Sequence, residues 1–180
     1  MKKSFERKYA IHVGSMKYGP REEQLSIDQE FFDHFEDSPA KDGDISVKLD
    51  MFRYETHIDV KFILEGNLQL NCDRCLEPYA FPIESEHRII YSFDKELNFK
   101  GYEVMYADPY ANYLSLVQEL YDFISIAIPL RRVPDESIHQ CDPQVTAFIL
   151  TEESGGSTKE EEKEIDPRWE ALKKLKDLED

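Results

Sequence analysis

The chain has 180 residues, of which 22 are Lys or Arg and 38 are Asp or Glu, and its net charge is −16 with histidine counted as neutral. An apolar fraction of 41% is enough for a folded core, so a wholly disordered chain is excluded. No stretch approaches 18 consecutive apolar residues and the first residues lack the apolar segment of a secretory signal, so we expect a cytoplasmic protein with no membrane segment.

The charge is unevenly distributed along the chain. Residues 1–21 carry six basic side chains and one acidic one, whereas residues 22–150 have a net charge of −16 and residues 151–180 a net charge of −5. A body this acidic repels phosphate and attracts basic proteins. We therefore do not expect a broad basic surface for nucleic acid, and expect a basic protein as partner instead.

Alternating apolar residues predict an antiparallel sheet in the middle of the chain. Residues 45–51 and 58–64 alternate with period two across a short connection, which predicts a hairpin. The second run resumes at residues 68–72 after Gly66 and Asn67, an interruption typical of a bulge or tight bend. Alternation over residues 81–93 and a shorter run over 102–106 add two more strands.

The period becomes helical after Asp108 and Pro109. Apolar residues three and four apart predict a helix over about residues 112–128 that covers the sheet and ends before Pro129. The aromatic residues around 31–35 indicate a short helical turn or a loop anchored by aromatic side chains. Residues 1–150 are thus expected to form one α+β domain, an antiparallel β-sheet covered by a helix.

The C-terminal part has a different composition. Residues 151–165 are acidic and almost free of large apolar side chains, which predicts a flexible acidic linker. Residues 166–180 predict an amphipathic helix, with Asp166 as N-cap, Pro167 at the first helical position and apolar residues at Trp169, Leu172, Leu175 and Leu178. Its apolar stripe either folds back onto the body or docks on a partner.

Cys72 and Cys75 form a Cys-x-x-Cys pair, a spacing that can bind zinc through two thiolates. His139 and Cys141 could complete a tetrahedral site, although their separation is short for a zinc knuckle, and reduced, partly buried thiols are the alternative. A redox enzyme is less favoured, because the pair leads into another strand instead of opening a helix. The sequence contains no catalytic motif, so we expect no enzyme.

Several segments together resemble the YceD family, the large ribosomal RNA subunit accumulation proteins long catalogued as a domain of unknown function. They are residues 70–76, residues 116–130, Cys141, and Asp166 to Trp169 followed by Leu172 and Leu175. Many members carry a second cysteine pair in the later position, where this chain has His139 and Cys141. The length between strand and helix is similar to that of the Bacteroidetes-type variant.

The resemblance implies a non-enzymatic role in ribosome biogenesis, in the synthesis, processing or stability of large-subunit (23S) ribosomal RNA. It implies binding to a ribosomal protein or a precursor particle, with ribosomal RNA as a further direct contact and no small-molecule substrate. The expected binding residues are basic or apolar: Lys2, Lys3, Arg7, Lys8, Arg131, Arg132, Arg168, Trp169, Leu172 and Leu175. A cytosolic thiol protein and a zinc-stabilised interaction module are the alternatives.

Overall fold

The computed structural model describes residues 2–36, 38–97, 99–135, 138–145 and 147. By its internal contacts the chain divides into two units, Met1–Cys141 and Asp142–Asp180. The helices and strands between Lys2 and Ala127 all belong to the first unit. The predicted linker at 151–165 and the predicted helix at 166–180 lie outside the described residues.

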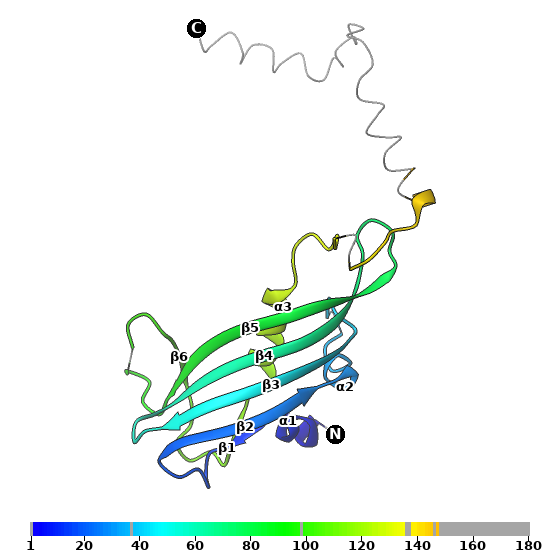
Figure 1. The fold of residues 1–180 in the computed structure, drawn as a ribbon. Helices are drawn as coiled ribbons and strands as arrows, with labels where there is room; N and C mark the ends of the chain where they lie inside the picture. Colours follow the sequence, from blue (N-terminus) through cyan, green and yellow to red (C-terminus); the bar gives the residue numbers. More distant parts are fainter. Residues whose placement is uncertain (1, 37, 98, 136–137, 146, 148–180) are drawn as a thin grey trace, which may run out of the picture. The chain divides into compact units, whose positions relative to one another are not determined.

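A five-stranded sheet dominates the first unit, with the strand order β2-β3-β4-β5-β6 (Figure 1). Its strands are β2 (Gly19–Ile27), β3 (Asp42–Arg53), β4 (His57–Asn71), β5 (Pro78–Ser92) and β6 (Glu103–Tyr106). The predicted hairpin is confirmed, since β3 and β4 pair antiparallel, with Val47 opposite Leu64. The α+β fold class is confirmed as well.

The predicted interruption at Gly66 and Asn67 is wrong. The strand β4 continues through both residues, with Gly66 opposite Ile45 on one side and Ile83 on the other. A Cβ atom on Gly66 would lie 2.1 Å from the Asp44 carbonyl oxygen, and the residue has φ +157. Glycine therefore allows β3 and β4 to approach closely here without breaking the pairing.

Both edges of the sheet differ from the prediction. At one edge, β6 pairs with residues 89–92 of β5 in parallel, although the sheet was expected to be antiparallel throughout. Because β6 pairs only with the last four residues of β5, the connecting chain has to return by a short distance, and a loop can make this parallel connection without a helix. At the other edge, β2 was not predicted, because its central residues 21–24 are all charged or polar.

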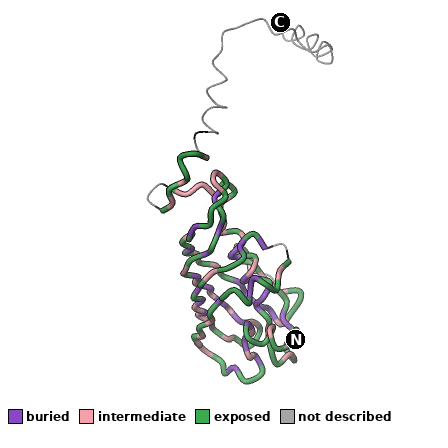
Figure 2. The backbone as a smooth tube through the Cα atoms, turned by 90° about the vertical axis from the view of Figure 1, so that its right-hand side faces the viewer, coloured by how far each residue is buried: buried purple, intermediate pink, exposed green. Residues whose placement is uncertain are grey.

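One face of the sheet carries the core. Side chains on this face alternate with exposed ones along the strands, as the short buried and exposed segments in Figure 2 show. The fully buried residues on β3 and β4 include Ile45, Val47, Leu49, Ile58, Val60, Phe62 and Leu64. This alternation confirms that one face of the predicted strands faces the core.

The helix α3 (Val117–Ala127) packs on this face. Its Phe123 ring lies 5.1 Å from the ring of Phe62 and stacks on His87 at 4.0 Å between centroids. The predicted end before Pro129 is confirmed, because Ile128 is extended. The predicted start near 112 is wrong, since residues Tyr113–Ser115 form β7.

The N-terminal residues complete the cover of the core. The short strand β1 (Ala10–His12) pairs antiparallel with β7, and α1 (Lys2–Lys8) contacts both strands. The helix α2 (Gln29–Phe32) contacts β3. Tyr9 and Phe31 are fully buried, and Phe35 stacks on Tyr121 of α3 at 3.8 Å between centroids. The basic segment 1–21 is therefore part of the folded unit.

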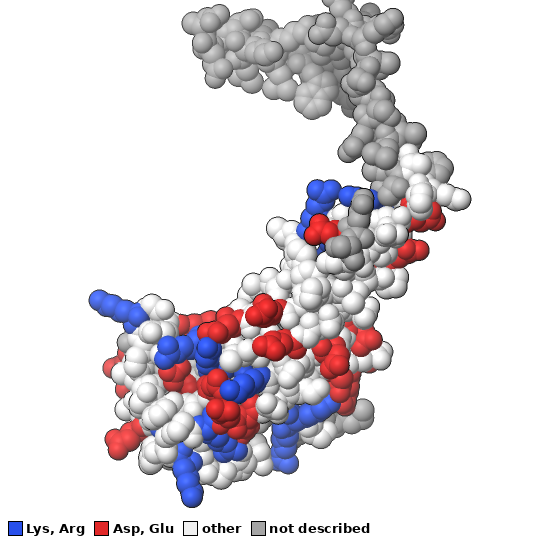
Figure 3. All heavy atoms as spheres, viewed as in Figure 1, with Lys and Arg blue, Asp and Glu red and all other residues white. Residues whose placement is uncertain are grey.

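The opposite face of the sheet is exposed and carries charges of both signs (Figure 3). Its cations contact carboxylates on neighbouring positions: Lys48 with Asp50 at 2.9 Å and Glu22 at 3.3 Å, Lys61 with Glu86 at 2.8 Å, and Arg88 with Asp59. Because each of these cations already has an acidic partner, this face offers little free positive charge to a phosphate backbone.

Candidate metal centre

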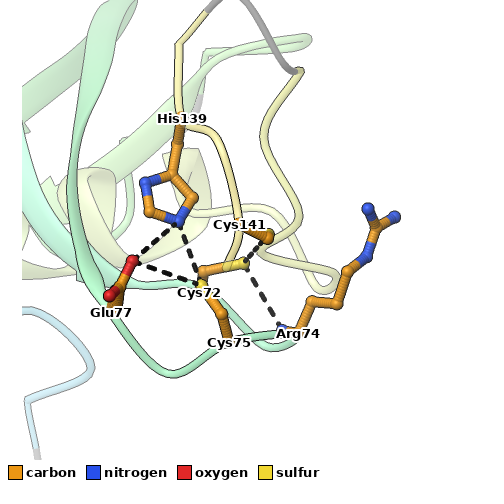
Figure 4. Close-up of polar contacts among 6 residues, drawn as sticks. All are labelled: Cys72, Arg74, Cys75, Glu77, His139 and Cys141. Carbon is orange, nitrogen blue, oxygen red and sulfur yellow. Dashed lines mark hydrogen bonds and ion pairs between the residues drawn. The ribbon is translucent and has the colours of Figure 1, made fainter. Parts of the chain in front are cut away.

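The three cysteines and His139 meet at the tip of the β4–β5 hairpin (Figure 4). Cys72 directly follows β4, and Cys75 lies in the turn that leads to β5. His139 and Cys141 come from the segment after α3, more than 60 residues later in the sequence. The four residues expected from the sequence as ligands are thus brought together by the fold.

The hairpin turn is held by its own backbone. The Cys72 N–H donates to the Glu77 carbonyl at 2.9 Å, and the Leu76 N–H donates to the Cys72 carbonyl at 2.9 Å. Leu76 adopts φ +63, which a β-carbon disfavours, and its side chain is 77% exposed. The turn accepts this strain because the two hydrogen bonds fix the path of the chain between the cysteines.

The donor atoms of the four residues all lie within 4.8 Å of one another. The Cys72 and Cys141 sulfurs are 3.7 Å apart, and the Cys75 sulfur is 3.0 Å from Nε2 of His139. Cys72 is fully buried, in phase with Leu68 and Leu70 on β4, while Cys75 and Cys141 are half-buried. The cluster therefore lies at the edge of the core, with one side accessible from solvent.

The surroundings act differently on the cysteine thiols. Burial works to raise the pKa of Cys72, but hydrogen bonds from the backbone N–H groups of Cys75 and Arg74 and from the thiols of Cys141 and Cys75 together outweigh it, so this pKa is lowered. The Arg74 N–H lies 3.4 Å from the Cys72 sulfur. Burial and the two neighbouring cysteines raise the pKa of Cys141 to about 11. Two thiols 3.7 Å apart thus differ in how readily they ionise.

Asp73 and Glu77, which sequence reasoning did not single out, support the cluster. Asp73 binds Arg132 through backbone and side chain, and so ties the hairpin turn to the segment that carries His139. The Glu77 carboxylate lies 3.8 Å from Nε2 of His139 and 4.0 Å from the Cys75 sulfur. Their place in the sequence, Asp73 between the two cysteines and Glu77 two residues after Cys75, could have indicated that they belong to the cluster.

The residues expected to bind a partner differ in how accessible they are in the structure. Lys8 pairs with Glu30 at 2.9 Å and Asp28 at 3.2 Å, and Arg7 lies over the Tyr113 ring at 5.2 Å. Arg132 pairs with Asp73, whereas Arg131 is exposed. Lys2 and Lys3 begin α1, and their side chains are not described. Arg168, Trp169, Leu172 and Leu175 lie outside the described residues.

A second site, which the sequence did not indicate, is a groove of about 370 Å³ between α3 and β6. Three carboxylates line it, those of Glu103, Glu119 and Asp122, together with the apolar Met105 and Ile126. None of these carboxylates lies within 4.0 Å of a Lys or Arg nitrogen in the part of the chain that the structure describes. The groove is acidic and partly apolar.

Glu119 is the most buried of these carboxylates, with 9% of its surface exposed. Burial raises its pKa, and the neighbouring charges of Asp122 and Glu103 add to the effect. Ile126, one helical turn beyond Asp122, is 74% exposed. An approaching cation would relieve the repulsion among the three carboxylates, and an apolar side chain beside it would cover Ile126.

We compared the chain with known protein families. A family model described as large ribosomal RNA subunit accumulation protein YceD matches residues 60–176, well over half of the chain. The chain belongs to the YceD family. The matched range includes both the Cys-x-x-Cys turn and Cys141, as well as the groove on α3.

Two further comparisons gave no match, one with curated proteins and one with solved structures. The YceD family is named for accumulation of the large ribosomal RNA subunit. Among the described residues, the structure has no helix of the length and apolarity needed to span a bilayer.

Proposed function

We propose that this protein is a non-enzymatic ribosome biogenesis factor that supports accumulation of 23S ribosomal RNA by binding a basic ribosomal protein on a large-subunit precursor. The observation that carries the proposal is the YceD family match over residues 60–176. The net charge of −16 supports a basic protein as the first partner.

The groove between α3 and β6 is the surface that fits such a partner best. A Lys or Arg side chain of the partner would pair with Glu119 or Asp122, and an apolar neighbour would pack on Ile126. Ribosomal proteins carry basic segments of this kind. The three carboxylates then contribute both specificity and faster association at low salt.

Direct contact with RNA is a smaller part of the proposal. Of the cations expected to bind, Lys8 and Arg132 already pair with carboxylates of this chain, whereas Arg131 is exposed and could meet a phosphate. The family match extends to residue 176 and so includes Trp169 and Leu172. The prediction that this C-terminal segment provides a second contact is retained, because a tether raises the effective concentration of a weak contact.

The proposal is tested by depleting the protein in cells and measuring large-subunit and small-subunit ribosomal RNA separately. We expect a selective loss of the large-subunit RNA, restored by the wild-type gene. Capture of the tagged protein after RNase treatment should retain an identified basic large-subunit protein. Unchanged large-subunit RNA on depletion would refute the proposed function.

Charge-reversal variants test whether the partner binds at the groove or responds only to the overall negative charge of the protein. Glu119→Lys combined with Asp122→Lys should release the captured ribosomal protein and fail to restore large-subunit RNA. The matched control reverses Glu84 and Glu65, two exposed carboxylates on the opposite face of the sheet, and should bind as the wild type does. Replacement of both Cys72 and Cys75 by Ser separates this proposal from a thiol enzyme. A thiol enzyme would lose its function in this variant, whereas an assembly factor would stay folded and still bind the particle.

A further inference from the structure

We propose that the open edge of β5 binds an extended segment of the basic partner protein, which adds to the sheet as a further strand in line with β6. This inference rests on the proposed function for the nature of the partner, and it adds where and how that partner is held. Within the described residues, β5 pairs with β4 along its whole length, whereas β6 pairs only with Ile89–Ser92. Residues 80–87 thus have a neighbouring strand on one side only.

The pairing pattern shows which backbone groups of β5 face the open edge. In an antiparallel pair each residue directs its N–H and C=O to the same side, and successive residues alternate. The pairing of β4 with β5 has no bulge, and the Ser92 carbonyl accepts from the Ala107 N–H on the side away from β4. Even-numbered residues therefore face outward, and in the described part of the chain the backbone groups of Glu84 and Glu86 have no strand partner. Pro82 has the same parity, and a strand tolerates proline where the missing N–H faces an unpaired edge.

The other edge of the sheet is protected against such pairing. Arg21 and Glu23 of β2 form an ion pair and lie opposite the buried Met51 and Leu49, so two charged side chains lie on the core side of that edge. Inward-pointing charges on an edge strand hinder the addition of another strand. The core-side residues along the open edge of β5 are instead uncharged at neutral pH: Phe81, Ile83, Ser85 and His87.

A pocket of about 240 Å³ lies between this edge and the end of α3. Its lining includes Ile83, Ala127 and Ile126, the last of which is 74% exposed. Oγ of Ser85 and Nε2 of His87 are buried in the same lining and, among the described residues, have no hydrogen-bond partner. Unsatisfied buried polar atoms indicate a missing partner. A strand added at the edge would direct every second side chain over this pocket and would cover Ile126.

Charge identifies the occupant as part of a basic protein. The pocket continues into the acidic groove, because Ile126 lines both. The end of the added strand beside β6 would lie next to Glu103, which is the first residue of β6 and is paired with Ile89. A Lys or Arg side chain at that end would enter the groove. A second copy of this chain fits poorly, since each copy has a net charge of −16.

Amide exchange of the full-length protein, measured by NMR, tests the edge residue by residue. In the free protein the amides of Glu84 and Glu86 should exchange at least about 100-fold faster than those of Ser85 and His87, which pair with β4. The probe is the peptide Thr-Arg-Thr-Val-Thr-Val-Thr-Arg-Thr, which should slow the two outward amides by at least about tenfold. A copy of the peptide with every backbone amide N-methylated should have no effect.

Three results of this measurement would overturn the proposal. Equal protection of outward and inward amides in the free protein would show that the edge is already covered, by this chain or by a second copy. No gain in protection with the peptide at about 2 mM would show that the edge takes up no strand. An equal effect of the N-methylated copy would show that the peptide binds without main-chain pairing.

Variants of Glu84 separate the main chain from the side chain. Glu84→Pro removes an outward N–H and leaves the pairing with β4, whereas Glu84→Ala removes the carboxylate and keeps the N–H. We expect Glu84→Pro to weaken binding of the peptide, and capture of the basic partner, by at least about tenfold, while Glu84→Ala binds as the wild type does. If Glu84→Pro lowers the melting temperature by more than about 5 °C, Ile126→Ser at an exposed helix position decides instead, with an expected loss of about fivefold in peptide affinity.

The capture experiment distinguishes this inference from the proposed function. Capture of the partner that is equal for Glu84→Pro and the wild type, but lost on reversal of Glu119 and Asp122, would overturn the added strand and leave the proposed function standing. If the wild type captures no basic large-subunit protein, the proposed function fails, and the exchange measurement with the peptide alone decides whether the edge of β5 takes up a strand.

Discussion

Asp73 and Arg132, 59 residues apart, hold each other by both backbone and side chain. The Asp73 N–H donates to the Arg132 carbonyl at 2.9 Å, and the Arg132 N–H donates back to Oδ2 of Asp73 at 2.7 Å. The guanidinium adds Nε and Nη2 contacts to Oδ1 at 3.1 and 2.9 Å. The pair joins the Cys-x-x-Cys turn to the segment after α3 in a single geometry.

Replacing Asp73 with Ala should therefore detach that segment without unfolding the sheet. Two of the four contacts use the carboxylate to accept from the guanidinium, and a third uses it to accept from a backbone N–H. We expect faster trypsin cleavage after Arg131 and Arg132, and a loss of about tenfold in zinc affinity if the site binds zinc. Asp44→Ala, an exposed carboxylate on β3, is the control. Unchanged cleavage would contradict this role.

The same pair gives a prediction for acid pH. The backbone N–H and guanidinium of Arg132 lower the pKa of Asp73, so the folded state favours the charged form. Its contribution to stability is complete above the ordinary pKa of about 3.8 and is lost as pH falls through the lower folded value. Asp73→Ala should thus weaken the attachment at neutral pH more than at about pH 2, measured by hydrogen exchange.

Gly66→Ala should destabilise the protein strongly. The new Cβ would lie 2.1 Å from the Asp44 carbonyl oxygen and 2.7 Å from Cα of Ile45, both backbone atoms that cannot rotate away. We expect a loss of more than about 3 kcal/mol in the free energy of unfolding in urea. Gly101→Ala, with φ +85 and open space around it, should lose only about 1 kcal/mol. Equal losses would show that the close approach of β3 is unimportant.

Glu119→Gln should stabilise the free protein and weaken its partner binding. Burial raises the pKa of Glu119, so the charged form is disfavoured in the folded state; this cost is complete above the folded pKa and disappears below about 4.5. We expect the melting temperature to rise by about 2–4 °C at neutral pH and by less near the ordinary pKa. Glu84→Gln is the exposed control. A fall in melting temperature at neutral pH would contradict this expectation.

His87 should remain neutral in the folded protein somewhat below pH 6.5, the ordinary pKa of histidine. Its ring stacks on Phe123, and burial lowers its pKa, with Glu103 opposing the shift. The unfolded chain binds a proton at His87 more readily than the folded protein does. The contribution of His87 to the free energy of unfolding is therefore complete above about pH 6.5 and falls as pH drops toward the folded pKa, by at most about 1.4 kcal/mol per pH unit. His87→Phe should reduce this dependence. NMR titration of the imidazole measures the pKa directly.

Much of the sheet and its helix could be predicted, because these elements are encoded locally. Alternation with period two identifies the hairpin of β3 and β4 from neighbouring residues alone. The end of α3 follows from Pro129, whose ring restricts the residue before it. The Cys-x-x-Cys pair was recognisable as a ligand pair from its spacing, and the YceD resemblance from its flanking residues.

The remaining elements depend on which segments meet in space. The parallel pairing of β6, the pairing of β1 with β7, and the acidic edge strand β2 leave no periodic signal that identifies their partners. Gly66 looks like an interruption of a strand, since the sequence does not show the neighbouring chain for which it makes room. His139 and Cys141 are ordinary loop residues until the chain returns past Arg132 to the hairpin. Residue types and local periods are properties of the sequence, whereas the cysteine–histidine cluster and the acidic groove exist only once distant segments have packed together.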